Sequence, residues 1–365
     1  MKHKDYLLTF IIPMWNRADN ICYCLDSILS QALEFPFEIV VVDDCSTDNS
    51  CSIVKEIVGD NNRTRLIDSF LANDLPETVS LFRELSEEEE FEIRSRIRLI
   101  CLEINNGAAT ARNRGMEESL GEFIWFVDSD DFIAAGSLKR IKPIISTNRY
   151  DIIRFFTKSS TVVPPSYIID SKSTGLTDLD DKSPDDILFM LRSGTVWSRI
   201  YRKEFIGSYR FNQDYSYSED SLFVWLTTLN AHKIAYLKDT LYGYMDNPSS
   251  LTSIKPYERF VCYVKVVDEY LSIIKRINRP KSYKRVLIKE CEKRLYTHAF
   301  YTYDYDEITP QMWEQWYNVY FNVMVNNKLR ALGSRLVSFL IWKLRFNKLI
   351  IIIFRSIIKR GGYIR

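Results

Sequence analysis

Residues 37–48 read Phe37-Glu38-Ile39-Val40-Val41-Val42-Asp43-Asp44-Cys45-Ser46-Thr47-Asp48. A continuous apolar run that ends in turn-forming polar residues predicts a strand buried on both faces of a sheet. Residues 7–13 form an earlier apolar run, and residues 18–31 between the two runs carry apolar side chains at helical spacing. A strand, a helix and a strand in this order predict two parallel strands joined by a right-handed crossover.

The same alternation continues along the chain. We expect helices over residues 48–58 and 108–120 and strands over residues 97–103 and 122–127. Short strand-like runs follow at residues 151–156, 196–201 and 233–237, mixed with helical runs at 183–191 and 219–229. This order predicts an α/β fold, with a Rossmann-like mixed sheet flanked by helices.

The chain divides into two regions by its pattern. We expect a catalytic-sized domain over residues 1–252 and a helical C-terminal region over residues 253–365, because helical spacing dominates after about residue 256. Residues from about 61 to 96 lack a clean apolar period and carry many charges. We interpret them as a solvated, partly helical insertion in the first domain.

The composition excludes several classes of protein. The 365 residues are 46% hydrophobic, which is enough to build a substantial core. Lys and Arg number 49 and Asp and Glu 48, so no charge excess favours nucleic acid, and we expect no nucleic-acid partner. Three histidines argue against a histidine-rich zinc centre. Seven irregularly spaced cysteines predict reduced thiols in a cytoplasmic protein instead of a disulfide framework.

Residues 328–365 form an apolar and basic tail, and no acidic residue follows Glu314. Charges near the centre of the apolar run cost about 2.5–3.5 kcal/mol each on insertion into a bilayer, which disfavours a spanning helix. On a helix, Lys348, Arg355 and Lys359 fall on one side and apolar residues on the other. This pattern predicts peripheral binding to the inner face of the cell membrane. The alternative is a terminal helix packed on the protein with its basic face in water.

Polar residues gather where the predicted strands end, and ligands of open parallel sheets bind beyond those ends. Carboxylates concentrated at two strand ends repel one another unless a cation or a donor-rich ligand relieves them. Hard oxygen ligands suit Mg²⁺ or Mn²⁺ completed by phosphate oxygens. An isolated Asp-x-Asp triplet is also explained by turn chemistry or helix capping. The residues at the four strand ends are Pro13, Trp15, Asn16, Asp43, Asp44, Asn106, Gly107, Asp128, Ser129 and Asp130.

Two later segments carry further candidates. Arg112 lies on a helix rich in small residues, where it reaches a bound phosphate or is simply a surface arginine on a tightly packed helix. Glu219 and Asp220 open a helix. Carboxylates at that position cap the helix, and a base that deprotonates a sugar hydroxyl also needs a positioned carboxylate.

Together these motifs resemble the family 2 glycosyltransferases with a GT-A nucleotide-sugar-binding fold, over residues 7 to about 252. Trp15 stands where the family usually has tyrosine. Cys45 stands where it has glycine, at a turn whose shape the sequence does not define. The motifs that carry the resemblance are Pro13-Met14-Trp15-Asn16, Val41-Val42-Asp43-Asp44-Cys45-Ser46-Thr47-Asp48, Asn106-Gly107 with Ala111-Arg112-Asn113-Arg114-Gly115, Asp128-Ser129-Asp130 and Glu219-Asp220.

The resemblance implies a role for each carboxylate. Asp44 binds uracil, Asp128 lies on the ribose or phosphate side, and Asp130 with Asp128 binds Mn²⁺ or Mg²⁺. Asp220, accompanied by Glu219, acts as the base toward the acceptor hydroxyl. The remaining strand-end residues and Arg112 belong to the nucleotide side.

The resemblance also implies the reaction. It is an inverting transfer of one sugar from a UDP-sugar to a hydroxyl of a glycan acceptor. The acceptors that the resemblance implies are lipid-linked glycans in capsule, exopolysaccharide or lipopolysaccharide synthesis. The Gln-x-x-Arg-Trp motif of processive synthases does not follow Asp220, which favours a single transfer. Two alternatives remain open: a non-catalytic nucleotide-sugar or carbohydrate-binding scaffold at the membrane surface, and a nucleotidyltransferase.

Overall fold

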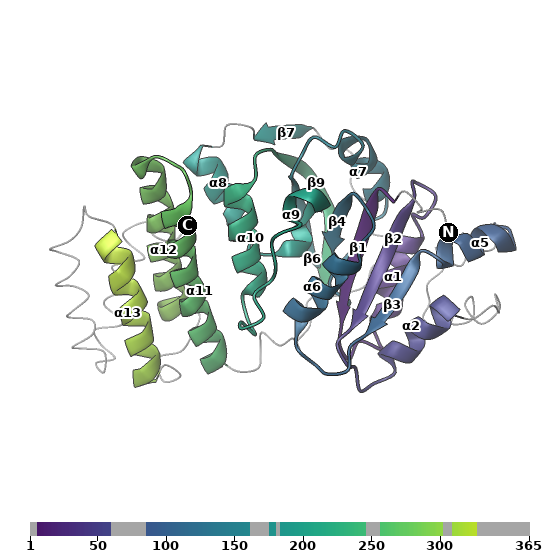
Figure 1. The fold of residues 1–365 in the computed structure, drawn as a ribbon, viewed down its shortest axis with the longest axis horizontal. Coiled ribbons are helices and arrows are strands. Elements are labelled where there is room, and N and C mark those ends of the chain that lie inside the picture. The colour runs from purple at the N-terminus through teal and green to yellow at the C-terminus, as the bar shows by residue number, and fades with distance from the viewer. Residues whose placement is uncertain are drawn as a thin grey trace. The chain divides into compact units, whose positions relative to one another are not determined.

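The computed structural model describes residues 6–59, 85–160, 175–179, 183–245, 256–301 and 309–326. The chain forms two compact units (Figure 1). Unit 1 comprises Met1–Asp181, Thr195–Gln213 and Ala231–Asn247, and unit 2 comprises Lys182–Gly194, Asp214–Asn230 and Pro248–Arg365. Two segments from within residues 1–252 therefore group with the C-terminal helices. The functional domain boundary that we expect at residue 252 remains a prediction.

Unit 1 contains a mixed sheet of nine described strands in the order β3-β2-β1-β4-β8-β6-β9-β5, with β7 paired to β9 (Figure 1). The first four strands in this order are parallel, and β8 then runs antiparallel to β4. The α/β class that we expect from the sequence is confirmed. The bounds of the strands are β1 Leu8–Met14, β2 Phe37–Asp43, β3 Ile97–Cys101, β4 Phe123–Phe126, β5 Phe132–Ile133, β6 Ile152–Ser160, β7 Leu176–Leu179, β8 Arg199–Arg202 and β9 Ile234–Met245.

Both faces of the central strands are covered, which explains their continuous apolar runs. Every residue of β1 and β2 is buried. Because side chains alternate along a strand, Ile39 and Val41 pack in the large core on one face, while Val40 and Val42 pack with Ala111 on the other. The carboxyl ends of these strands are therefore held rigidly where the polar motifs begin.

Helices connect the strands of unit 1, and α6 packs against β1 and β2. Gly115 allows this close approach, because a Cβ there would lie 2.4 Å from Cγ2 of Ile11. Helix α5 lies within the expected insertion and begins with a capping box between Ser86 and Glu89, while residues 60–84 of the insertion lie outside the described residues. The helices are α1 Ile21–Leu29, α2 Ser50–Gly59, α5 Glu87–Arg94, α6 Ala108–Glu118, α7 Ser137–Ile145 and α9 Lys203–Ile206.

The described part of unit 2 is helical, as expected for the C-terminal region. Its core stacks Trp225 on Tyr270 at a centroid distance of 4.0 Å, with the guanidinium of Arg294 5.4 Å from the Trp225 ring. None of the helices that the structure describes has the length and hydropathy needed to cross a bilayer. The tail over residues 328–365 lies outside the described residues. The helices are α8 Pro184–Leu191, α10 Glu219–Asn230, α11 Pro256–Arg276, α12 Lys281–Tyr301 and α13 Pro310–Asn326.

Candidate functional site

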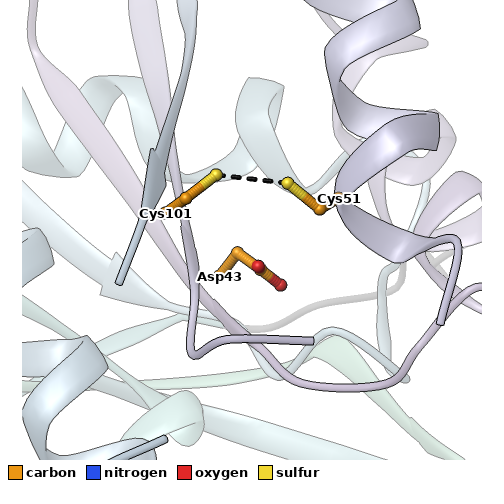
Figure 2. Close-up of side chains that lie close together, drawn as sticks. All are labelled: Asp43, Cys51 and Cys101. Atoms are coloured by element: carbon orange, nitrogen blue, oxygen red, sulfur yellow. Dashed lines mark hydrogen bonds between the residues drawn. The ribbon is translucent and has the colours of Figure 1, made fainter. Parts of the chain in front are cut away.

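Asp43 ends β2 and lies beside two cysteines (Figure 2). A carboxylate oxygen of Asp43 and the Sγ atoms of Cys51 and Cys101 all lie within 4.8 Å of one another. Asp43 is 3% exposed, and its Oδ2 accepts a hydrogen bond from the N–H of Ser46 at 3.3 Å. We expect Asp43 to be a nucleotide ligand, and that role remains a prediction.

Asp44 is buried and holds the turn that follows β3. Its Oδ1 accepts a hydrogen bond from the N–H of Asn106 at 2.9 Å, and its Oδ2 accepts one from Gly107 at 2.7 Å. Gly107 has a φ of 87°, which favours glycine because it has no Cβ. Asp44, Asn106 and Gly107 therefore lie together, as the strand-end argument predicts. Recognition of uracil by Asp44 remains a prediction.

Cys45 adopts the backbone conformation of the glycine that it replaces. Its φ is 61°, in the left-handed region. Its Sγ donates a hydrogen bond to the carbonyl oxygen of Glu103 at 3.5 Å, which ties the turn after β2 to the segment after β3. The turn thus keeps a glycine-like shape although its residue carries a side chain.

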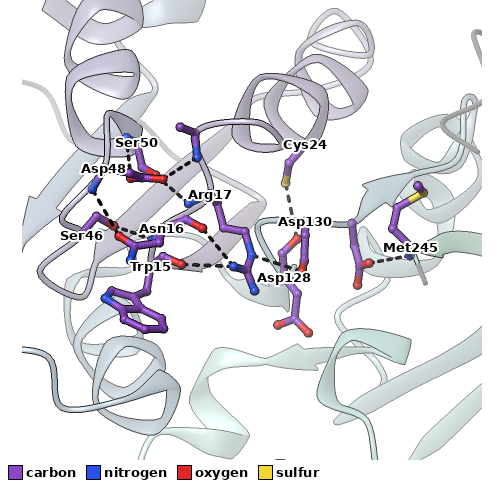
Figure 3. Close-up of polar contacts among 12 residues, drawn as sticks. Trp15, Asn16, Arg17, Cys24, Ser46, Asp48, Ser50, Asp128, Asp130 and Met245 are labelled. Atoms are coloured by element: carbon purple, nitrogen blue, oxygen red, sulfur yellow. Dashed lines mark hydrogen bonds and ion pairs between the residues drawn. The ribbon is translucent and has the colours of Figure 1, made fainter. Parts of the chain in front are cut away.

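Asn16 ties the loop after β1 to the loop after β2 (Figure 3). Its side-chain oxygen accepts hydrogen bonds from the N–H groups of Thr47 at 2.8 Å and Asp48 at 3.4 Å, and its own N–H donates to Ser46 Oγ at 2.9 Å. Its φ of 50° is a left-handed conformation that asparagine tolerates better than most residues. The asparagine of the first motif therefore shapes the loop of the second.

Asp48 strengthens the same connection. It accepts hydrogen bonds from the N–H of Ala18 at 3.1 Å and the N–H of Ser50 at 2.9 Å, and Ser50 Oγ in turn accepts the N–H of Arg17 at 2.7 Å. Partial burial opposes the charge of Asp48, but hydrogen bonds from Ser50 and Ala18 outweigh it and lower the pKa of this carboxyl. Asp48 thus links the two loops through hydrogen bonds to its carboxylate, and the backbone of Arg17 is held by its hydrogen bond to Ser50.

Each carboxylate of the Asp128-Ser129-Asp130 motif is paired with an arginine. Figure 3 shows the pair of Arg17 with Asp130. Arg17 Nε lies 3.2 Å from Asp130 Oδ2, and Arg112 Nη2 lies 3.0 Å from Asp128 Oδ1. The Asp128 and Asp130 side chains are 28% and 17% exposed, so solvent reaches both. The structure places the Arg112 guanidinium against Asp128, so Arg112 is not simply a surface arginine.

Asp131, the carboxylate that follows Asp130, fastens this loop to Tyr242 and Met245 of β9. Its Oδ2 accepts a hydrogen bond from the hydroxyl of Tyr242 at 2.6 Å, and its Oδ1 accepts one from the N–H of Met245 at 2.8 Å. The N–H of Asp128 donates to the same Tyr242 oxygen at 3.1 Å. Burial, and after it the charge of Asp128, raises the pKa of Asp131 to about 9. Both carboxylate oxygens of Asp131 are occupied by these hydrogen bonds, which leaves Asp128 and Asp130 as the carboxylates of this motif for a cation.

The donor set fits a hard divalent cation. Asp128 and Asp130 offer partly exposed carboxylate oxygens from one short loop, which are the ligands that Mg²⁺ and Mn²⁺ prefer in proteins. A cation at this position competes with Arg17 and Arg112 for the same oxygens. Both arginines are also suited to bind a diphosphate.

The remaining strand-end residues line the same edge. Pro13 lies within β1, opposite Val42 of β2, and is buried. Trp15 is 38% exposed, although a large aromatic side chain is commonly buried, and Ser129 is buried. An exposed indole beside the polar loops offers a flat surface to a ligand.

Glu219 and Asp220 begin α10 and belong to unit 2. Asp220 Oδ1 accepts a hydrogen bond from the N–H of Ser221 at 2.6 Å, and Ser218 before the helix has a φ of 65°. The hydroxyl groups of Ser221 and Tyr270 lie 2.6 Å apart. The capping alternative has support in this geometry, and the role of Asp220 as a base remains a prediction.

Sequence reasoning missed three residues of this network. Arg17 and Asp131 adjoin two of the motifs but receive no role of their own from the sequence, and Tyr242 is not among the expected site residues. Arg17 directly follows the Pro13-Met14-Trp15-Asn16 motif, so its charge was a usable signal. The pairing of Asp131 with Tyr242 spans 111 residues, and nothing local predicts it.

Comparison with known proteins agrees with these motifs. The family model described as glycosyl transferase family 2 matches residues 9–69 and 70–203, which together exceed half of the chain. The uncharacterized glycosyltransferase EpsJ of Bacillus subtilis is 28% identical over 273 residues, which is 73% of this chain and 66% of that protein. The poly(ribitol-phosphate) beta-N-acetylglucosaminyltransferase TarS of Staphylococcus aureus is 26% identical over 244 residues, 64% of this chain and 34% of TarS. The chain thus spans just under two thirds of EpsJ and about a third of TarS.

Solved structures support the same fold. The crystal structure of S. aureus TarS 1–349 in complex with UDP-GlcNAc superposes with a TM-score of 0.62 and 23% identity, covering 93% of this chain and 85% of that one. The complex of TarS 1–349 with UDP superposes with a TM-score of 0.61. At this level of identity the likeness concerns the fold.

Proposed function

Because the chain belongs to glycosyl transferase family 2 and has the GT-A fold, we propose that it transfers one sugar from a UDP-sugar to a hydroxyl of a glycan acceptor, with inversion at the anomeric carbon. The observation that carries this proposal is the meeting of four polar motifs at one edge of the unit 1 sheet, with Arg17 and Arg112 beside Asp130 and Asp128. The crystal structures of TarS 1–349 in complex with UDP and with UDP-GlcNAc support a UDP-sugar as the donor.

The nucleotide is proposed to bind beyond the ends of β1 and β2. Asp44 is buried and accepts hydrogen bonds from the N–H groups of Asn106 and Gly107, an arrangement that suits recognition of a uracil ring. Trp15, in the loop after β1, offers an exposed aromatic face. Pro13, Asn16 and Ser129 are proposed to line the rest of the nucleotide site. Asn16 also fixes the loop after β1 to the loop after β2.

The diphosphate is proposed to lie beside Asp128 and Asp130. These carboxylates would hold Mn²⁺ or Mg²⁺, which when bound offsets the charge that develops on the departing diphosphate. Arg17 and Arg112 orient the carboxylates and bring two fixed positive charges to the same position. Fixed charges of this kind stabilise a leaving group without reorganisation of water.

Asp220 is proposed as the general base, with Glu219 beside it. A base of this kind takes the proton of the acceptor hydroxyl as its oxygen attacks the anomeric carbon, while the bond to the diphosphate breaks on the opposite face. Attack from that face inverts the anomer. General base catalysis contributes about 10²–10⁴-fold to the rate.

The acceptor is proposed to be a lipid-linked glycan of a cell-surface polysaccharide. A polymeric acceptor is consistent with the name of TarS, a poly(ribitol-phosphate) beta-N-acetylglucosaminyltransferase. The basic tail over residues 328–365 is proposed to hold the protein at the cytoplasmic face of the membrane.

The test is turnover of UDP-sugars by the full chain. We expect release of UDP from one member of a panel of UDP-sugars in the presence of Mn²⁺, and loss of this activity in Asp130→Asn. Asp220→Asn should lower transfer about 10²–10⁴-fold, with little change in the affinity for UDP measured by calorimetry. The matched control is Asp268→Asn, an exposed position on α11 in the same unit.

Three results would contradict the proposal or one of its parts. Binding of UDP without turnover of any donor, with an acceptor extract present, would indicate a non-catalytic binding protein. Full transfer activity in Asp220→Asn would show that this carboxylate is not the base. Full activity after removal of divalent cations would show that the reaction needs no metal ion.

A further inference from the structure

Two cysteines and one aspartate of unit 1 form a compact group of metal-ligand atoms. Cys51 lies in the first turn of α2, Cys101 ends β3, and Asp43 ends β2 (Figure 2). The Sγ atoms of Cys51 and Cys101 are 3.1 Å apart, and both lie within 4.8 Å of an Asp43 carboxylate oxygen. Three elements thus each contribute one ligand atom to the same point.

The fold determines this arrangement. Asp43 and Cys101 are direct neighbours across the parallel strands β2 and β3, so their positions follow from the register of the sheet. Helix α2 packs on β3 and brings Cys51 over the pair. The group therefore does not depend on a single adaptable side chain.

A buried, unpartnered oxygen points to a ligand at this position. Asp43 is 3% exposed, and its Oδ1 accepts no hydrogen bond from any residue that the structure describes. A buried carboxylate oxygen without a partner is costly, and most such atoms in native proteins have one. A cation coordinated by Oδ1 would remove this cost.

The distances suit a tetrahedral thiolate site. Bonds of about 2.3 Å from zinc to sulfur and about 2.0 Å to oxygen place two thiolates about 3.8 Å apart and a carboxylate oxygen about 3.5 Å from each. The two Sγ atoms have to separate by less than an ångström from their distance of 3.1 Å. Cys101 is exposed, so solvent can supply a fourth ligand.

The charges also balance. Two thiolates and one carboxylate around a divalent ion leave one net negative charge. The ammonium group of Lys55, one helical turn after Cys51, hydrogen-bonds the Cys51 side chain and offsets this charge. The soft sulfur ligands favour Zn²⁺ over the hard cations Mg²⁺ and Mn²⁺. This separates the group from Asp128 and Asp130, which offer oxygen alone.

We propose that Asp43, Cys51 and Cys101 bind a Zn²⁺ ion that joins α2 to the ends of β2 and β3. The ion would stabilise the base of the loop that carries Asp44 and Cys45. This site shares Asp43 with the residues expected to bind the nucleotide, but it involves neither Asp130 nor Asp220, and the binding of Co²⁺ or Zn²⁺ is measured without sugar transfer.

The test uses the reduced, metal-free full chain titrated with Co²⁺, which reports thiolate ligation by a sulfur-to-cobalt absorption band. We expect one Co²⁺ per chain, displaced by equimolar Zn²⁺ and not by a large excess of Mg²⁺. Cys51→Ser and Cys101→Ser should each weaken binding at least 10-fold, and Asp43→Asn should weaken it while keeping the band. Cys262→Ser, a half-buried thiol in unit 2, is the matched control and should bind as the parent does.

Three outcomes would overturn the proposal. The first is the absence of a sulfur-to-cobalt band, and the second is a band that Cys51→Ser leaves unchanged. The third is loss of two free thiols on exposure to air with no metal bound, which would identify the pair as a disulfide former. Circular dichroism of each variant shows that a lost band does not come from a lost fold.

Discussion

Cys45 carries a strained backbone at the turn of the second motif. Its φ of 61° costs about 1–2 kcal/mol for a residue with a Cβ, whereas glycine adopts it freely. The hydrogen bond from its Sγ to Glu103 recovers part of this cost. The turn after β2 thus has a left-handed residue at position 45 although that residue is not glycine.

Cys45→Gly should stabilise the protein by about 0.5–1 kcal/mol. The relief of strain exceeds the loss from the greater freedom of glycine in the unfolded chain. Cys45→Ala, which keeps the Cβ and removes the sulfur, is the control and should destabilise. Urea unfolding of the three proteins measures the difference, and a less stable glycine variant would show that the sulfur contact outweighs the strain.

The packing of α6 on β1 depends on Gly115. This contact positions Arg112, which lies one turn earlier on the same helix and pairs with Asp128. A side chain at residue 115 would therefore shift the helix and the arginine together.

Gly115→Ala should destabilise the protein by about 1–3 kcal/mol, because the new methyl group would lie 2.4 Å from Ile11 Cγ2. Gly207→Ala is the control, since its nearest neighbours lie at 3.5 Å, an ordinary contact. Thermal unfolding measures both variants. Equal stability of the two would show that β1 and α6 separate at no cost.

Asp151 joins three strands by one buried carboxylate. It accepts hydrogen bonds from Arg202 at the end of β8 and from the N–H groups of His232 at 2.6 Å and Lys233 at 3.1 Å, just before β9. Burial opposes the charge of Asp151, but the hydrogen bonds, that of Arg202 foremost among them, outweigh it and lower its pKa.

The free energy of unfolding should therefore fall in acid. A carboxyl whose folded pKa lies below its unfolded value of about 3.9 contributes stability above that pH, and this contribution is lost as the pH falls through the folded value. Asp151→Asn should cost about 3 kcal/mol at pH 7, with a smaller cost below pH 4. Urea unfolding from pH 3 to pH 7 checks this, with Asp268→Asn as control. A cost that is independent of pH would mean that shape and not charge matters at residue 151.

The whole molecule shows which features local sequence can predict. The runs of β1 and β2 were predictable because burial on both faces leaves a continuous apolar signal. The strand predicted at 122–127 appears as Phe123–Phe126, and the helix predicted at 18–31 appears as Ile21–Leu29, since element ends depend on local competition for hydrogen bonds. The loops at the strand ends were predictable because polar, turn-forming residues directly follow each apolar run.

Long-range pairings were not predictable from local patterns. The two-residue strand β5 exists only because β9 pairs with it, far away in the sequence. The approach of Cys51 to Cys101 spans 50 residues and follows from the packing of α2 on β3, which no local pattern encodes. The ion pair of Arg17 with Asp130 likewise depends on the order of β1 and β4 in the sheet.

The basic tail should bind the full chain to anionic vesicles. Replacing Lys348, Arg355 and Lys359 by Glu should lower the apparent affinity about 100-fold or more, because each basic residue near an anionic surface contributes about 1 kcal/mol. Cosedimentation with phosphatidylglycerol vesicles measures this, and neutral vesicles give the baseline.

The matched control replaces Lys265, Arg276 and Lys281 by Glu, since these are exposed basic residues of the described helices. It should keep most of the binding. An equal loss in both triple variants would indicate attraction by overall charge, with no dedicated surface in the tail.

The anchoring of Asp131 by Tyr242 and Met245 has a consequence for synthesis on the ribosome. The acidic loop leaves the ribosome 111 residues before Tyr242, its partner. At about 5–20 residues per second, this interval lasts on the order of 5–20 s. The nascent chain therefore carries an acidic loop without its Tyr242 anchor until β9 has emerged.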